Sequence, residues 1–166
     1  MNYYYLVLFA TGLGFQTCWL GGTFNKRDFE NNVKLHEDEF IPIVSPVGLK
    51  KEKPRVFESS MRAFVCANKR KPWSELFFEE SSSVHLNEAR AEAYVIPLEM
   101  VRLGPSASSK QHWRIIKDKK TFHFYLCRTK GYGVTSYDMQ KNDMGIAKCH
   151  FELSAKVKGR AEQWKV

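Results

Sequence analysis

The hydrophobic and polar positions in the first third of the chain predict one strongly apolar helix and several shorter elements. Residues 3–13 are apolar almost all round, which predicts a helix that is buried on most faces and that ends at Gly14. Residues 15–20 predict a short extended stretch. Residues 40–49 alternate apolar side chains before a proline and a glycine, as a strand leaving a sheet does. Residues 26–35 predict a short helix with acidic residues in its first turns.

The rest of the chain shows both helical and strand periods. Residues 50–64 are of mixed charge and predict a helix in their later part. Residues 87–104 predict a long helix, or a pair of helices divided at Pro97. A charged "DKK" joins two alternating runs at 112–117 and 121–128, which predicts two antiparallel strands. An amphipathic helix ending at a glycine is predicted for 140–159. Together these elements predict an α+β fold, an antiparallel sheet flanked by helices.

An internal similarity links the two ends of the chain. A helix, a terminal glycine and a tryptophan five residues later occur twice, at Ala10, Gly14 and Trp19 and at Ala155, Gly159 and Trp164. We interpret the chain as a single domain, 1–166, with about 1–80 ending a first half-unit and about 85–166 forming a second. Because almost nothing precedes the first copy of this helix, we expect an N-terminally truncated first half-unit.

The composition is that of a globular protein with a basic surface. The chain has 166 residues, of which 43% are hydrophobic, and its net charge is +8. Such a charge favours an anionic partner such as phosphate, a nucleotide or nucleic acid. A solvated basic surface explains it equally well. The opening apolar run lacks the basic residues of a signal peptide and is broken by glycines well short of a membrane span.

The cysteines indicate reduced thiols in a cytoplasmic protein. Cys18, Cys66, Cys127 and Cys149 contain no CxxC pair, and four scattered cysteines do not form a disulfide framework. A zinc site could combine His123, Cys127, Cys149 and His150. Neighbouring residues on a helix diverge by about 100°, so Cys149 and His150 would not face one ion, and we predict no metal site.

Two candidate binding segments stand out before residue 80. Gly21 and Gly22 follow Trp19, and successive amides without side chains can approach a flat ring or an anion. A tight turn between two elements accounts for the same pair. Three cations, Lys69, Arg70 and Lys71, stand immediately before a proline, and we call them the basic segment. Arginine supplies a forked donor for phosphate, although many such runs are solvated loops.

A third candidate is the segment 104–115, whose first part, residues 104–111, we call the Pro-Ser loop. Pro105 stops the preceding helix, and short polar side chains follow it: Ser106, Ser108, Ser109, Lys110 and Gln111. Such loops bind polar ligands, and they also simply cap helices. The sequence contains no Ser-His-Asp grouping, no metal-binding carboxylate cluster and no GxxxxGK motif. We therefore name no catalytic side chain, and the candidates suit a phosphate-bearing cofactor.

Taken in order, these segments resemble the flavin-dependent nitroreductase family, in particular its subgroup with two half-units fused in one chain. The resemblance covers nearly the whole sequence. The segments that carry it are "GLGFQTCWLGGTFNKRDF", "IPIVSPVG", "KRKPWSELFF", "LEMVRLGPSASSKQHWRI", "FHFYL" and "YDMQKNDMGIAKCHFELSA".

The resemblance implies an FMN cofactor that is reduced by NAD(P)H and passes electrons to a nitroaromatic, a quinone or a similar small molecule. It places a glycine loop against the flavin ring, here Trp19, Leu20, Gly21 and Gly22. Arg70 matches the family's phosphate-binding arginine, with Lys69 and Lys71 as weaker candidates. The second half-unit would supply the Pro-Ser loop contacts, here Pro105, Ser106, Ala107 and Ser109.

The sequence also departs from the family pattern. It lacks the N-terminal arginine-rich motif that grips the flavin, and Ser109 and His112 stand where the family usually has Asn and Pro. The alternative is therefore a catalytically impaired remnant of the fold with weak or no flavin binding. Two chains could associate to complete the fold. A nucleic-acid-binding domain is a third hypothesis, but no binding motif supports it, and we expect neither nucleic acid nor membrane as partner.

Overall fold

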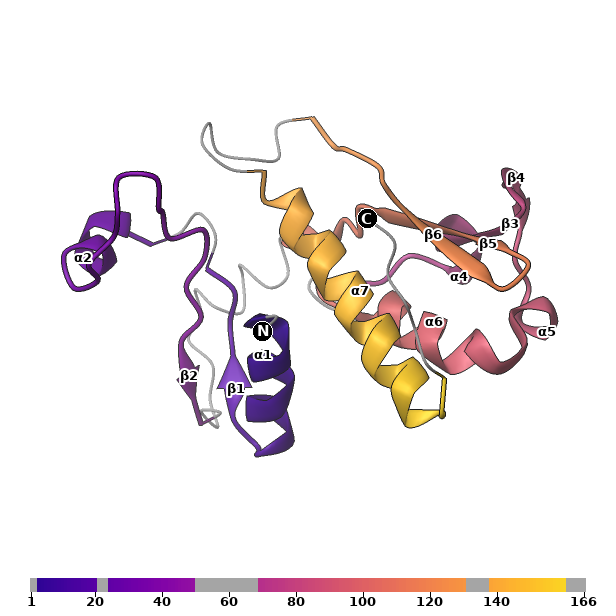
Figure 1. Ribbon diagram of the computed structural model, residues 1–166, viewed down its shortest axis with the longest axis horizontal. Helices are drawn as coiled ribbons and strands as arrows, with labels where there is room; N and C mark the ends of the chain where they lie inside the picture. Colours follow the sequence, from indigo (N-terminus) through magenta and orange to yellow (C-terminus); the bar gives the residue numbers. More distant parts are fainter. Residues whose placement is uncertain (1–2, 21–23, 50–68, 131–137, 161–166) are drawn as a thin grey trace. The chain divides into compact units, whose positions relative to one another are not determined.

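A computed structural model describes residues 3–20, 24–49, 69–130 and 138–160. The chain divides into two compact units, residues 1–53 with 133–139 and residues 54–132 with 140–166 (Figure 1). The helix expected within 50–64 lies outside the described residues. The division into two half-units stays a prediction.

The first unit combines helix α1 (Tyr3–Gly12) with a small antiparallel ladder. Strands β1 (Gln16–Thr17) and β2 (Val47–Gly48) pair, and the ladder continues through a bridge between Leu20 and Val44. The expected strand at 40–49 is therefore only partly formed. Helix α2 (Lys26–Glu30) ends five residues earlier than expected, because tight turns at Asn31 and Asn32 follow it.

Helix α1 is less buried than its composition suggested. Tyr4, Val7 and Ala10 are buried, whereas Leu6 and Phe9 are more than half exposed. The expectation of burial on most faces is therefore not met. Among the described residues, no helix is both long enough and apolar enough to cross a membrane.

The second unit contains a four-stranded sheet in the order β4-β3-β5-β6. Its strands are β3 (Phe77–Glu79), β4 (Ser81–His85), β5 (Trp113–Asp118) and β6 (Thr121–Leu126). The hairpin β5–β6 confirms the predicted strand pair. The sheet is mixed, however, because β3 and β5 pair in parallel. The α+β class is confirmed, and the expected antiparallel pairing holds for β3–β4 and β5–β6 but not for β3–β5. The long connection from β3 to β5, which runs through β4 and the helices of residues 88–103, lets these two strands run the same way.

The remaining elements of this unit are helical. They are α4 (Trp73–Leu76), α5 (Glu88–Ala91), η1 (Glu92–Tyr94), α6 (Val95–Leu103), η2 (Ala107–Ser109) and α7 (Gln140–Val157). The expected division of 87–104 occurs at Glu92, which has φ 54°, and not at Pro97. Pro97 lies in the first turn of α6, where the missing amide hydrogen is not needed.

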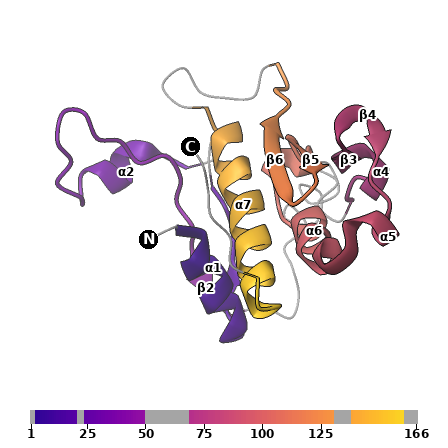
Figure 2. The same ribbon diagram turned by 45° about the vertical axis from the view of Figure 1, so that its right-hand side comes forward.

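Helices α6 and α7 lie side by side and pack against the sheet (Figures 1 and 2). Phe151 of α7 contacts Phe122 and Phe124 of β6 and stacks on Tyr94. Leu98, Val101, Trp113, Ile115 and Ala147 complete the centre of this core and are fully buried. The core therefore fixes the ends of α6, β5 and α7 relative to one another.

Helices α1 and α7 end in the same way. The Gly14 amide donates to the Thr11 carbonyl, and the Phe15 amide donates to the Ala10 carbonyl. At the other helix, the Gly159 amide donates to the Lys156 carbonyl and the Arg160 amide to the Ala155 carbonyl. Both glycines have positive φ, 85° and 70°, so each helix ends in a Schellman motif.

Candidate functional site

The Pro-Ser loop begins where α6 can no longer continue. The amide of Gly104 donates to the carbonyl of Val101 at 3.1 Å, and Pro105 cannot extend the helix. A Cβ at position 104 would lie 3.0 Å from the Val101 oxygen and 3.2 Å from Cδ2 of His150. The absence of a side chain at Gly104 therefore lets the backbone at the end of α6 lie close to His150 of α7.

The loop then turns through left-handed backbone at residues that are not glycine. Ser108, Ser109 and Gln111 have φ values of 48°, 56° and 49°. Such conformations are costly for residues with a Cβ, and they gather at active sites and ligand clamps. Internal hydrogen bonds hold this shape: Ser109 N to Ser106 O, Lys110 N to Ala107 O, and Gln111 N to Ser106 Oγ.

Gln111 ties the loop to the basic segment. Its side chain is fully buried; Oε1 accepts from the Lys71 amide at 2.5 Å, and Nε2 donates to the Arg102 carbonyl at 2.7 Å. Two segments forty residues apart are thus joined. The structure brings together the second and third candidate segments of the sequence.

Arg70 is the cation of the basic segment that faces the start of the Pro-Ser loop. Its Nε donates to the Leu103 carbonyl at 3.1 Å, and its Nη1 donates to the Lys69 carbonyl at 2.9 Å. The Lys71 ammonium instead lies 2.9 Å from the Glu75 carboxylate and, by hydrogen bonding to it, lowers the pKa of that carboxyl. Lys69 is exposed.

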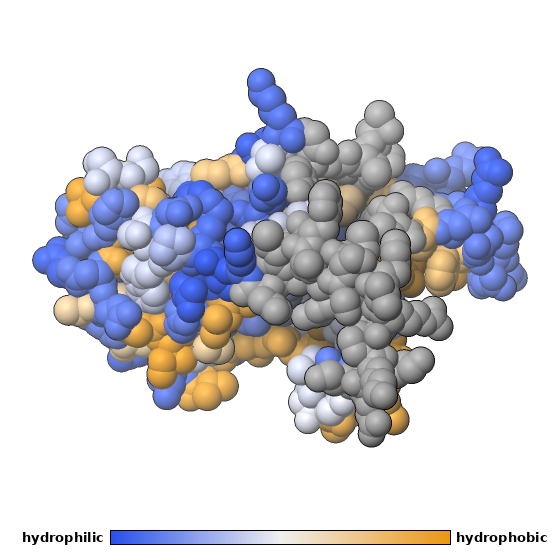
Figure 3. All heavy atoms as spheres, turned by 180° about the vertical axis from the view of Figure 1, so that it is seen from behind, coloured by the Kyte–Doolittle hydropathy of each residue, from blue (hydrophilic) through white to orange (hydrophobic). Residues whose placement is uncertain are grey.

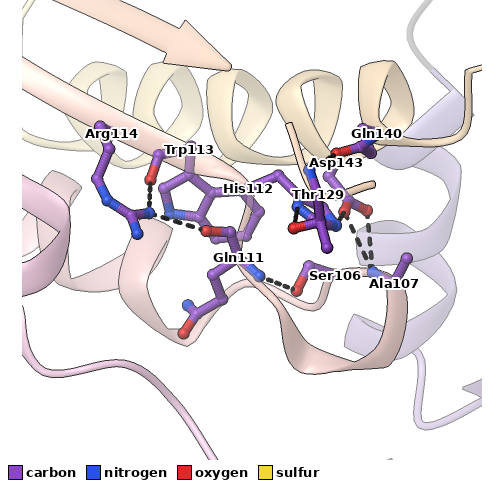
Figure 4. Close-up of polar contacts among 9 residues, drawn as sticks. All are labelled: Ser106, Ala107, Gln111, His112, Trp113, Arg114, Thr129, Gln140 and Asp143. Carbon is purple, nitrogen blue, oxygen red and sulfur yellow. Dashed lines mark hydrogen bonds and ion pairs between the residues drawn. The ribbon is translucent and has the colours of Figure 1, made fainter. Parts of the chain in front are cut away.

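A polar cluster built around the buried Asp143, His112 and Gln140 adjoins the loop (Figure 4). Asp143, in the first turn of α7, accepts from the Ala107 amide and lies 3.6 Å from His112 Nε2. His112 Nδ1 is 3.2 Å from Thr129 Oγ1, and Gln140 Oε1 accepts from the Thr129 amide. Arg114 Nη1 donates to the carbonyls of Gln111 and Trp113.

The predicted glycine loop is only partly described. Trp19 packs against Tyr4 with ring centroids 5.6 Å apart. Leu20 exchanges both backbone hydrogen bonds with Val44. Gly21 and Gly22 lie outside the described residues, and Trp19 and Leu20 belong to the first unit. The meeting of this segment with the other two stays a prediction.

Three residues near the loop were absent from the predicted site. Asp143 and Arg114 carry no local sequence signal, because their partners are distant in sequence or are backbone atoms. His112 was noted only as a departure from the family pattern. An acidic residue at a helix start is a general stabilising feature. The position of Asp143 in the sequence therefore could not indicate that its side chain contacts the loop.

Two neighbouring titratable groups lie on α7, of which His150 lies against Gly104 at the start of the loop. Burial lowers the pKa of His150 to about 4 and raises the pKa of Cys149 to about 11. Both side chains are therefore neutral at pH 7. Cys18 and Cys127 are free and exposed, while Cys66 lies outside the described residues. In the described part of the chain, no three His, Cys, Asp or Glu residues gather as metal ligands.

The face seen from behind carries both hydrophilic and hydrophobic residues among those that the structure describes (Figure 3). Seen from behind, hydrophilic and hydrophobic residues are interspersed, with hydrophobic ones gathered along the lower edge of the left-hand part (Figure 3). In the second unit, exposed apolar residues of the described part come from several elements: Val84, Ile96, Leu103, Tyr125 and Val157. The candidate site is therefore taken from the contacts between the Pro-Ser loop and the basic segment.

Comparison with known proteins agrees with this fold. Residues 3–155 match the model of the family described as "Putative TM nitroreductase". The chain also resembles a crystal structure from Thermotoga maritima MSB8, described as "a putative nitroreductase", with a TM-score of 0.54 and 22% identity over 97% of this chain. That similarity establishes the fold alone. This chain covers 57% of that protein's length. No curated protein matches the sequence.

Proposed function

This chain belongs to the "Putative TM nitroreductase" family, and we propose that it is an FMN-dependent oxidoreductase. In this proposal NAD(P)H is the electron donor and a nitroaromatic, a quinone or a similar small molecule is the acceptor. The observation that carries the proposal is the joining of the basic segment to the Pro-Ser loop by Lys71, beside the contact of Arg70 with the end of α6.

Arg70 fits the role of phosphate ligand. Two backbone carbonyls orient its guanidinium, and this preorganisation lowers the entropy lost on binding. A guanidinium has five N–H donors in a planar fork that matches a phosphate. We assign the phosphate to Arg70 rather than to Lys71, because an ammonium is a point charge that lacks this fork. Lys69 would add longer-range positive charge.

The Pro-Ser loop fits the polar side of the cofactor. The Ser106 hydroxyl oxygen accepts from the Gln111 amide, so its own hydrogen can donate to a ligand. Pro105 and Ala107 flank Ser106 in the sequence and are both half-buried. Ser109 sits in the left-handed turn and offers a second hydroxyl. We propose that these four residues line the flavin.

The glycine segment would supply the amide beside the ring. The Leu20 amide donates to Val44 at 2.8 Å, so it is already used. We therefore assign the donor to Gly21 or Gly22, with Trp19 and Leu20 shaping the approach. When bound, FMN supplies the hydride-accepting and electron-donating chemistry. The protein holds the phosphate, orients the ring and donates hydrogen bonds, and we assign no side chain as an acid or base.

Cofactor retention tests the proposal. The full chain is mixed with FMN, desalted and examined for flavin absorbance, and NAD(P)H is then added without oxygen. Retained flavin that bleaches supports the oxidoreductase. A folded, colourless protein contradicts it and supports the impaired remnant. Salt-sensitive retention on immobilised nucleic acid, without flavin binding, would instead support the nucleic-acid-binding hypothesis.

A further inference from the structure

The Asp143 carboxylate is buried against the backbone of the Pro-Ser loop. The residue is 3% exposed, and its Oδ1 and Oδ2 lie 3.1 and 3.2 Å from the Ala107 amide nitrogen. Ala107 immediately precedes the left-handed residues Ser108 and Ser109. The carboxylate therefore holds the loop at the residue where its strained turn begins (Figure 4).

The imidazole of His112 is a second polar group that lies beside the Asp143 carboxylate. It is 2% exposed, and its Nε2 lies 3.6 Å from Asp143 Oδ2. Thr129 Oγ1 lies 3.2 Å from Nδ1 on the other side of the ring, and the His112 carbonyl accepts from the Cys127 amide at 2.7 Å. The imidazole is thus fixed between the end of β6 and the first turn of α7.

A gain in folding stability does not by itself explain why these polar side chains are buried together. Burying a carboxylate beside an imidazole costs desolvation energy, and well-packed apolar residues often serve as well or better. A buried polar group does, however, select one geometry, because any shift leaves it without a hydrogen-bond partner. What this cluster fixes is the position of the Ala107 amide, between Ser106 and the strained turn.

We propose that Asp143, supported by His112, is a positioning residue that sets the conformation of the Pro-Ser loop for the cofactor. This inference rests on the proposed FMN function for its consequence in binding. It acts through the Ala107 amide, and neither Asp143 nor His112 touches the flavin.

The experiment compares Asp143→Ala and Asp143→Asn with Asp118→Ala, which removes an exposed carboxylate at the end of β5. Hydrogen exchange of the Ala107 amide is measured by NMR on the full, flavin-free chain, and FMN affinity by quenching of flavin fluorescence. Loss of a charge-assisted hydrogen bond should speed exchange and weaken FMN binding roughly tenfold in Asp143→Ala. Asp143→Asn keeps a weaker acceptor. Its Ala107 exchange should be roughly threefold faster and its FMN affinity roughly threefold lower than in the wild type. Asp118→Ala should change neither.

The readouts separate positioning from general destabilisation and from failure of the proposed function. Faster Ala107 exchange with unchanged exchange in β5 and partial rescue by Asp143→Asn supports positioning. Unchanged Ala107 exchange and FMN affinity in folded Asp143→Ala overturns it. If Asp143→Ala does not fold, the same comparison in Asp143→Asn decides. If the wild-type chain binds no FMN, the proposed function fails, while Ala107 exchange still decides whether Asp143 positions the loop.

Discussion

The backbone amide of Lys71 donates a 2.5 Å hydrogen bond to Oε1 of the fully buried Gln111. This single contact joins the basic segment to the Pro-Ser loop across forty residues of sequence. The same side chain donates to the Arg102 carbonyl at the end of α6. Gln111 therefore connects three backbone segments around the candidate site.

Gln111→Leu should destabilise the second unit by about 2–4 kcal/mol, because it leaves the partly buried Lys71 amide and Arg102 carbonyl without this partner. Denaturant unfolding measures the change in free energy. Gln16→Leu provides the control, since Gln16 is exposed on β1, and it should have little effect. Equal stabilities of the two variants would contradict the role assigned to Gln111.

Arg70→Ala should weaken FMN binding roughly ten- to a hundredfold, since a charge-assisted hydrogen bond contributes about 1.5–3 kcal/mol. Fluorescence titration measures the affinity. Arg160→Ala, at an exposed position after α7, also removes one positive charge and controls for net charge. The phosphate assignment is wrong if the two variants bind FMN equally well.

Gly104→Ala should lower the free energy of unfolding by about 1–3 kcal/mol through overpacking. The new Cβ would meet the Val101 oxygen at 3.0 Å and the His150 ring at 3.2 Å. Gly145→Ala offers a control of opposite sign, because nothing lies within 4 Å of that position in α7 and alanine favours helix. Thermal unfolding distinguishes them, and a stabilised Gly104→Ala would refute the close approach.

Stability should fall between pH 6.5 and about 4 because of His150. Burial lowers its folded pKa from 6.5 to about 4, so the unfolded chain takes up a proton first as the pH drops. The unfolded state then binds more protons, and stability present above pH 6.5 is lost as the pH falls through the folded pKa. The full effect is up to about 3 kcal/mol.

Unfolding free energy measured at several pH values tests this expectation. His150→Gln removes the titrating ring and should flatten the pH dependence over that interval. His123→Gln, at an exposed position on β6, serves as control and should leave the slope unchanged. A wild-type slope that persists in His150→Gln would assign the loss of stability to other groups.

Local sequence patterns predicted the elements whose causes are local. The hairpin β5–β6 follows from alternating side chains joined by a charged turn. The ends of α1 and α7 follow from Gly14 and Gly159, which adopt positive φ without a steric penalty. The break in 87–104 was placed wrongly because proline is tolerated in a first helical turn.

The sequence by itself determined the α+β class, the ends of α1 and α7, the hairpin and the residue types suited to a phosphate-bearing cofactor. Only the tertiary structure decided that β3 and β5 run in parallel, that Lys71 meets Gln111, and that Asp143 holds Ala107. These pairings join residues 36 to 40 positions apart. Their partners are largely backbone groups, which every residue carries, so packing of α6 and α7 on the sheet selects which of them meet.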